Sequence, residues 1–194
     1  MTRTVAFAAL AALTAAVSLP AFADNVEFAE PHARVSQHDA TSTVVDGDRV
    51  IIYYGRPHTN DPKTGEARAV WGKLVPWGEV WRTGADEATL LLTGKTITLG
   101  SGSATLKLAP GVYSLWTVPL AGEGSKLIVN SQYALWGTQY DSSHDIGSVP
   151  LQKDTLSSPL HQFTMQVKKT GGSTGVIKLV WEDLQFSVPF TVGD

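Results

Sequence analysis

The residues best suited to chemistry are crowded into one short segment. Although charged residues make up only 17% of the chain, the stretch "VPWGEVWRTGADEATLLL" (75–92) holds Trp77, Glu79, Trp81, Arg82, Asp86 and Glu87. Arginine presents a planar fork that binds carboxylates or phosphates through two hydrogen bonds, and indole faces stack on other rings or cations. The segment therefore indicates either a ligand-binding site or a lattice of buried ion pairs that stabilises the fold.

A second group of polar and aromatic residues precedes this segment, at the end of a predicted strand, "IIYYGRPH" (51–58). If the fold brings the two groups together, their arginines and aromatic rings would bind a small polar or anionic ligand. The residues predicted to bind it are Tyr54, Arg56, His58, Trp81, Arg82 and Asp86. In the alternative, the arginines pair with nearby acids and tie irregular loops to the domain; breaking such a buried pair costs roughly 3–5 kcal/mol.

Acid–base catalysis is a further alternative, in which the protein is a periplasmic hydrolase. Glu79 and Glu87 are the candidate catalytic residues, with Arg82 holding the substrate. Asp86 and Glu87 are neighbours, and neighbouring side chains of a regular strand point to opposite faces. They would therefore not serve one site together. The sequence leaves open whether the protein is an enzyme, a binding domain or a purely structural envelope protein.

Metal and cofactor binding have little support in the sequence. The histidines form none of the closely spaced pairs typical of zinc sites. The remaining metal candidates are His58 beside a carboxylate, and the group Asp141, His144 and Asp145 in "YDSSHDIG" (140–147). The glycine-rich "GSGSAT" (100–105) lacks the lysine of a phosphate loop and predicts a hairpin turn. We expect no metal and no cofactor.

The first 23 residues, "MTRTVAFAALAALTAAVSLPAFA", have the layout of a secretory signal peptide. Arg3 precedes an apolar run from Val5 to Leu19, and the segment ends in Ala-Phe-Ala. We therefore expect export to the periplasm or the extracellular space. No later apolar run is long enough to span a bilayer, so we expect no membrane insertion after signal removal.

Composition narrows the range of partners. The net charge of −3 becomes more negative by one when Arg3 is removed, which argues against nucleic acid as a partner. The chain has no cysteine, so neither disulfides nor thiol catalysis are available. A small-molecule ligand is the partner that the sequence indicates; it points to no particular protein partner.

Alternating apolar and polar residues predict strands throughout the remaining chain. "QFTMQVKK" (162–169) and "LQFSVPFTV" (184–192) alternate over their full length. Pro189 predicts an edge position or a bulge for the second of these. Gly-containing turns separate the predicted strands, of which the others are 34–39, 49–55, 88–93, 95–99, 104–108, 112–118, 126–130 and 176–181.

This pattern predicts an all-β protein, an antiparallel, jelly-roll-like β-sandwich with little helix. One or two helical turns are expected at 131–137. Long irregular loops, rich in aromatic residues, glycine, proline and charge, are expected at 55–88 and 131–159. The predicted domain occupies 34–194, after a lead-in segment at 24–33.

Several motifs of the chain occur together in one known family. "IIYYGRP", "WGKLVPWGEVWRTGADEATLL", "LAPGVYSLWTVP", "WGTQYD" and "LVWEDLQFSVPFTV" follow one another in this order. The chain thereby resembles the secreted bacterial proteins of domain-of-unknown-function family 2911, from about Arg34 to Val192. The resemblance implies an exported, β-rich single domain and no assigned activity. One departure is the loop at 58–72, which is longer and more polar than the family's usual link.

Overall fold

The computed structural model describes residues 33–193, and the sandwich belongs to a compact unit that begins at Arg34. The predicted signal peptide (1–23) and all but the last residue of the predicted lead-in segment (24–33) lie outside the described residues. Among the residues that are described, no helix is long and apolar enough to cross a membrane.

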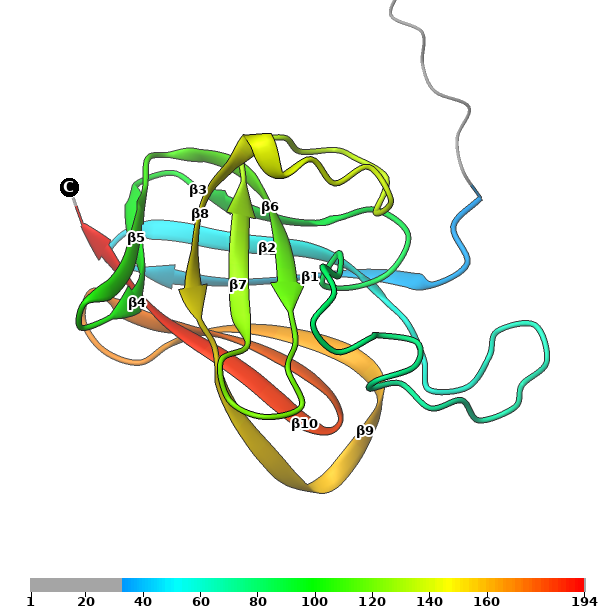
Figure 1. The fold of residues 1–194 in the computed structure, drawn as a ribbon. Helices are drawn as coiled ribbons and strands as arrows, with labels where there is room; N and C mark the ends of the chain where they lie inside the picture. The colour runs from blue at the N-terminus through cyan, green and yellow to red at the C-terminus, as the bar shows by residue number, and fades with distance from the viewer. Residues whose placement is uncertain (1–32, 194) are drawn as a thin grey trace, which may run out of the picture. The chain divides into compact units, whose positions relative to one another are not determined.

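Six strands form the larger of two antiparallel sheets (Figure 1). Their order across the sheet is β1-β2-β3-β6-β7-β8. The strands are β1 (Gln37–Val45), β2 (Asp48–Arg56), β3 (Thr89–Thr93), β6 (Gly111–Val118), β7 (Lys126–Asn130) and β8 (Asp145–Pro150).

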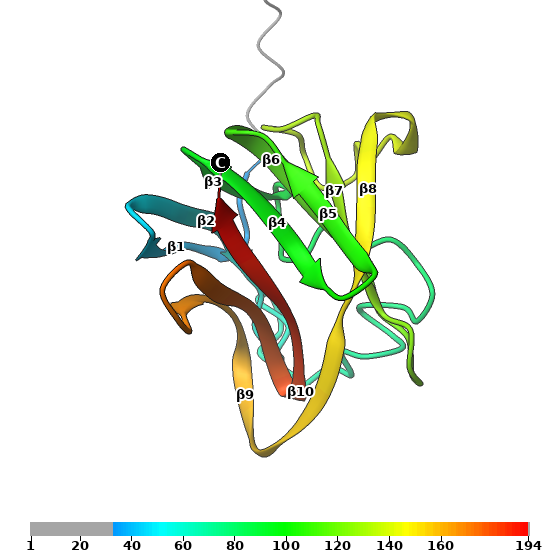
Figure 2. The same cartoon turned by 90° about the vertical axis from the view of Figure 1, so that its left-hand side faces the viewer.

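The smaller sheet has four strands in the order β5-β4-β10-β9, and Figure 2 shows β8 running directly into β9, so that the chain crosses between the sheets. Its strands are β5 (Ala104–Leu108), β4 (Thr96–Ser101), β10 (Thr174–Gly193) and β9 (Gln152–Lys169). Every pair of neighbouring strands in both sheets is antiparallel. The predicted all-β class with two antiparallel layers is confirmed.

The core lies between the sheets and follows from the alternation of the strands. On β2, Val50, Ile52 and Tyr54 are buried, whereas the intervening Ile51 is half-buried and Tyr53 is exposed. On β9, the predicted inward residues Phe163, Met165 and Val167 are all buried. These side chains belong to one apolar cluster with residues of β4, β7 and β10. At about 25 cal/mol per Å² of buried apolar surface, such a cluster is the main source of stability in a chain without disulfides.

The second predicted irregular stretch, 131–159, contains more strand than expected. β8 and the first part of β9 fall inside it. Serine and proline interrupt the apolar–polar alternation there, so the sequence does not predict a strand, although strand pairing itself does not require that alternation. No helix forms at 131–137; the one helical turn among the described residues is a 3₁₀ turn at Ser142–His144. The irregular part is residues 131–141, here termed the covering loop.

Of the two alternatives predicted from Pro189, the edge position is wrong, because β10 lies between β4 and β9, whereas β10 does bear irregularities of register, at Val180–Leu184. β10 pairs with β9 up to Ser187 and with β4 from Phe190 onward. Pro189 lies between the two paired stretches, where its missing N–H removes no ladder hydrogen bond.

The first predicted irregular segment, 55–88, is irregular in the structure and extends from one end of the sandwich (Figure 1). We divide it into the long loop, residues 57–80, and the signature loop, residues 81–88. The covering loop lies over the outer face of the large sheet, where Trp116, Ala88, Ile128 and Tyr140 form a second, smaller apolar cluster.

Candidate functional site

The signature loop is fastened at both ends by backbone hydrogen bonds. At its start, the N–H groups of Trp81 and Thr117 each donate to the other's carbonyl oxygen over 2.8 Å. Near its end, the N–H of Gly137 in the covering loop donates to the carbonyl of Asp86 over 2.9 Å. The loop is therefore held between β6 and the covering loop, and its side chains are presented in a fixed arrangement.

The backbone of this loop is strained and closely packed. Thr83 and Asp86 adopt left-handed φ angles of 55° and 62°. Such conformations cost of order 1–3 kcal/mol each for residues other than glycine and cluster at functional sites. Gly55 of β2 lets the loop approach, because a Cβ there would lie 2.1 Å from the carbonyl oxygen of Ala85. The loop thus depends on neighbouring residues to hold its conformation.

Trp81 anchors the signature loop to the core. Its ring stacks on Trp181 at 6.1 Å between centroids and meets the edge of Phe163 at 5.1 Å. Its indole N–H donates to the carbonyl of Gly84 over 3.0 Å within the loop itself. With its polar atom satisfied, the indole offers apolar surface to its surroundings.

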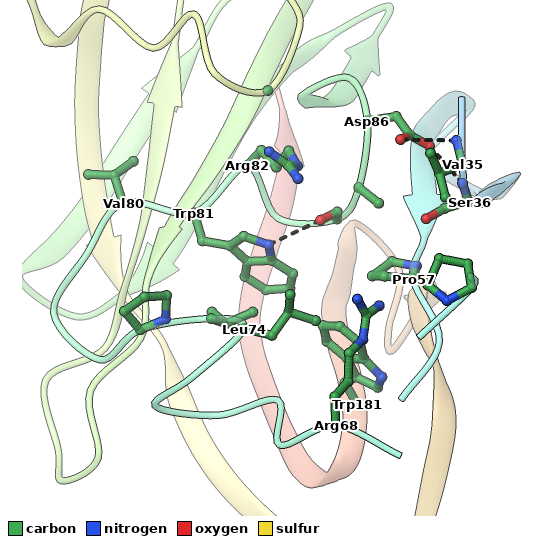
Figure 3. A pocket seen from close by; sticks show the side chains of 16 residues that line it. Val35, Ser36, Pro57, Arg68, Leu74, Val80, Trp81, Arg82, Asp86 and Trp181 are labelled. Carbon is green, nitrogen blue, oxygen red and sulfur yellow. Dashed lines mark hydrogen bonds between the residues drawn. The ribbon is translucent and has the colours of Figure 1, made fainter. Parts of the chain in front are cut away.

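A cavity of about 380 Å³ lies between the signature loop and the long loop. Its charged lining residues are Arg68 from the long loop and Arg82 and Asp86 from the signature loop. Trp81 and Trp181 contribute aromatic surface, and the remaining lining is largely apolar. Figure 3 shows the Arg82 side chain above the Trp81 ring and Arg68 rising from the opposite wall. We call this space the Arg68/Arg82 cavity.

The two arginines of this cavity share an unusual feature, since the Nε atom of each is buried and has no hydrogen-bond partner within residues 33–193. Arg68 uses its terminal nitrogens, donating to the carbonyl of His58 over 3.0 Å and lying 3.8 Å from Asp61. Arg82 takes part in none of the ion pairs found in the described part of the chain. Burial lowers the pKa of Arg82, and the charge of Asp86 opposes this shift. Both guanidinium groups stay charged at neutral pH.

Asp86 holds the beginning of the domain against the signature loop. Its two carboxylate oxygens accept hydrogen bonds from the backbone N–H groups of Val35 (3.3 Å) and Ser36 (3.0 Å). Because both oxygens are already engaged, Asp86 neutralises Arg82 only in part. Val35 and Ser36 also line the Arg68/Arg82 cavity, so Asp86 positions one of its walls.

Glu87 lies in a different environment from Asp86. One of its carboxylate oxygens is 2.7 Å from Nε of Arg34 and the other 2.9 Å from Nε2 of His38. Burial raises the pKa of Glu87, but the hydrogen bonds from Arg34 and His38 outweigh this effect and leave the pKa below its ordinary value. Glu87 lines a separate hollow with Tyr53, not the Arg68/Arg82 cavity. The neighbouring Asp86 and Glu87 therefore line different hollows.

The remaining predicted site residues lie around the cavity without lining it. Tyr54 is a core residue, and burial raises the pKa of its phenol. Arg56 and His58 line an adjacent hollow of about 280 Å³, which shares Arg68 with the Arg68/Arg82 cavity. Glu79 is exposed and lines none of the described hollows. Of the predicted set, the fold gathers Trp81, Arg82 and Asp86 at one cavity.

The sequence analysis did not identify Arg68, the second arginine that lines the cavity beside Arg82. The one available signal was its position in the unusual loop at 58–72, which carries no periodicity to place it. Trp181, at the end of the predicted strand 176–181, is 1% exposed and belongs to the core, yet it also lines the cavity. Long-range contacts of this kind depend on loop conformation rather than on local pattern.

The side chains suggested as metal ligands do not form a site. Within residues 33–193, no group of three or more histidine or acidic side chains is arranged to hold a metal ion. Asp145 instead accepts hydrogen bonds from Tyr140 (2.6 Å) and Asn130 (2.9 Å), which brace the covering loop. His144 lies 3.8 Å from Asp141 as an exposed pair.

Comparison with known proteins places the chain in a family. No match was found among curated proteins or among solved structures. The family model described as "Protein of unknown function (DUF2911)" matches residues 36–190, a range that includes both arginines of the cavity. The chain therefore belongs to the DUF2911 family.

Proposed function

We propose that the domain binds a small ligand through an anionic group held in the Arg68/Arg82 cavity. The observation that carries the proposal is that two charged arginines line one cavity, each with a buried Nε donor that the described chain leaves unpaired. A buried donor without a partner costs about 1–3 kcal/mol. A carboxylate or phosphate oxygen that reached the exposed part of these guanidinium groups would form charge-assisted hydrogen bonds with them.

The balance of charge in the cavity supports an anion rather than a cation. The lining carries two guanidinium groups and one carboxylate, that of Asp86, whose oxygens already accept two backbone hydrogen bonds; Asp61, 3.8 Å from Arg68, lies outside the lining. The strained φ angles of Thr83 and Asp86 fit a loop shaped for binding. With the secretory signal predicted at 1–23, binding would take place in the periplasm or outside the cell.

The two alternatives have weaker support. An acid–base hydrolase needs a general acid and a general base at one cavity, whereas Glu79 is exposed and Glu87 faces Arg34 and His38. A purely structural brace would pair Arg82 with an acid, yet none of the ion pairs within residues 33–193 includes it.

The proposal is tested by calorimetric titration of the purified protein with acetate, hexanoate, inorganic phosphate and, as a neutral comparator, 1-hexanol. We expect an anion to bind, and Arg82→Gln and Arg68→Gln each to weaken binding at least about tenfold, since a hydrogen bond to a charged group contributes about 1.5–3 kcal/mol. Arg49→Gln is the matched control, because Arg49 is exposed on β2 and outside the cavity. Absence of anion binding, or equal binding by all three variants, contradicts the proposal.

A further inference from the structure

We propose that the ligand is an amphiphilic monoanion, an alkyl or aryl carboxylate whose apolar body lies against the apolar wall of the Arg68/Arg82 cavity. This inference rests on the proposed function and narrows its ligand class. The charged group would lie between the two arginines, and the hydrocarbon would extend toward the rim formed by the long loop.

Exposed apolar side chains are concentrated at the mouth of this cavity. Among the described residues, eight large hydrophobic side chains are exposed, and three of these line the cavity: Val35 (57% exposed), Leu74 (42%) and Val80 (40%). Such side chains occur singly on most protein surfaces, whereas a group bordering a hollow is typical of a binding site. Figure 3 shows Val80 and Leu74 on one side of the hollow and Val35 on the other.

The tryptophans of the inner lining present only apolar surface, because their indole N–H groups are already paired. The indole N–H of Trp81 donates to Gly84 and that of Trp181 donates to His161, so neither is available to a ligand. Val75 and Pro57 add further apolar surface. A sugar, with hydroxyl groups on every side, would find few partners here, and burying unpaired hydroxyls is costly.

The charged groups of the lining are those of Arg68, Arg82 and Asp86, and the exposed lining is about equally polar and apolar. The buried donors that the described chain leaves unpaired are the Nε atoms of Arg68 and Arg82. Small-molecule sites combine apolar walls with a few placed polar groups and measure about 300–1,000 Å³. A volume of about 380 Å³ is at the small end of this range, which limits the ligand to a short chain or a single ring system.

The test is a calorimetric series of linear carboxylates from acetate to decanoate, each below its micellar concentration, beside the matching 1-alcohols. Affinity should rise about fourfold per methylene, the equivalent of about 0.8 kcal/mol, until the cavity is filled. The matching alcohols should bind at least about tenfold more weakly, because they lack the charge that the arginines bind.

Variants of the rim separate this inference from the proposed function. Leu74→Ser and Val80→Ser should reduce the gain in affinity per methylene. Ile146→Ser is the matched control, because Ile146 is equally exposed (41%) and lies outside the cavity. If anions bind in an Arg82-dependent way but chain length has no effect, the inference is wrong and the proposed function stands. If Ile146→Ser reduces the gain as much as Leu74→Ser, the apolar contact lies elsewhere and the inference is also wrong.

Discussion

Arg56 and Arg82 are the same residue type in very different surroundings. Arg56 donates to the carbonyl of Phe163 (3.2 Å), to the hydroxyl of Thr164 (3.0 Å) and to the carboxylate of Asp39 (3.1 Å). It thereby ties the end of β2 to β9. Arg82 has a buried Nε that no group within residues 33–193 accepts from. Arg56 therefore stabilises the fold, whereas Arg82 is the arginine that we propose to bind a ligand.

This difference predicts opposite effects of the same substitution. Arg56→Met should lower the free energy of unfolding by about 1–3 kcal/mol, because each of its hydrogen bonds contributes about 0.5–1.5 kcal/mol net. Arg82→Met should change it by less than about 1 kcal/mol, because no hydrogen bond of the guanidinium is lost and an unpaired donor is removed. Urea denaturation of both variants measures the difference. An Arg82→Met loss as large as that of Arg56→Met would assign Arg82 to the fold.

The residue types of the site could be predicted from the sequence, but their pairings could not. Trp81, Arg82 and Asp86 were predicted as a cluster from their spacing, and they line one cavity. The partner of Glu87, Arg34, is 53 positions away, and no local pattern encodes a contact over that separation. Arg68 was missed for the same reason.

At the scale of the elements, the strands with clear alternation were predicted within a few residues, as β2, β3 and β5 to β7 show. Prediction failed at β8 and at the first part of β9. There, Gly147, Ser148 and Pro150 replace the apolar residues that mark a strand. Pairing with β7 nevertheless makes β8 a strand, because tertiary contacts override weak propensity.

The first residues of the domain are attached to the signature loop by ionic contacts that depend on pH. Glu87, which contacts Arg34 and His38, has a pKa below its ordinary value of 4.5, and His38 also lies 3.9 Å from Asp86. A lowered pKa in the folded state gives stability that is present above about pH 4.5 and is lost as the pH falls through the folded value. Glu87→Gln should therefore be less stable than the natural protein at pH 5.

The measurement is urea unfolding of both proteins between pH 5 and pH 3. The difference in unfolding free energy should narrow steadily toward pH 3. A difference that stays constant over this range would show that the Glu87 carboxylate gains nothing from Arg34 and His38.

The covering loop and the signature loop meet at Gly137. A Cβ at this position would lie 1.9 Å from Cδ of Arg82 and 2.7 Å from the carbonyl oxygen of Asp86. Gly137→Ala should lower stability by about 1–3 kcal/mol, as overpacking does, and should displace the guanidinium that the proposed ligand requires. Gly122→Ala, where a Cβ would meet nothing within 4 Å, is the matched control. Equal stability and anion affinity in the two variants would contradict this packing.

At the scale of the whole molecule, the long loop and the signature loop are part of the core rather than attachments to it. The main apolar cluster joins residues of both sheets to Val70 and Val75 of the long loop. Trp71 and Trp81 pack against the same cluster, and Phe163 of β9 contacts Trp81 and Trp181 directly. The cavity wall and the space between the sheets are therefore built from the same side chains.

This continuity predicts that the loops and the sandwich unfold together. Tryptophan fluorescence reports strongly on the loops, which hold Trp71, Trp77 and Trp81, whereas far-UV circular dichroism reports on the strands. The two signals should give one coincident urea transition. Phe163→Ala should shift both by the same amount, at a cost of about 3–5 kcal/mol, and Tyr133→Ala, at an exposed position, should shift neither. A fluorescence change at lower urea concentration than the dichroism change would mean that the loops open independently, and the cavity would then lack the fixed walls that bind an anion.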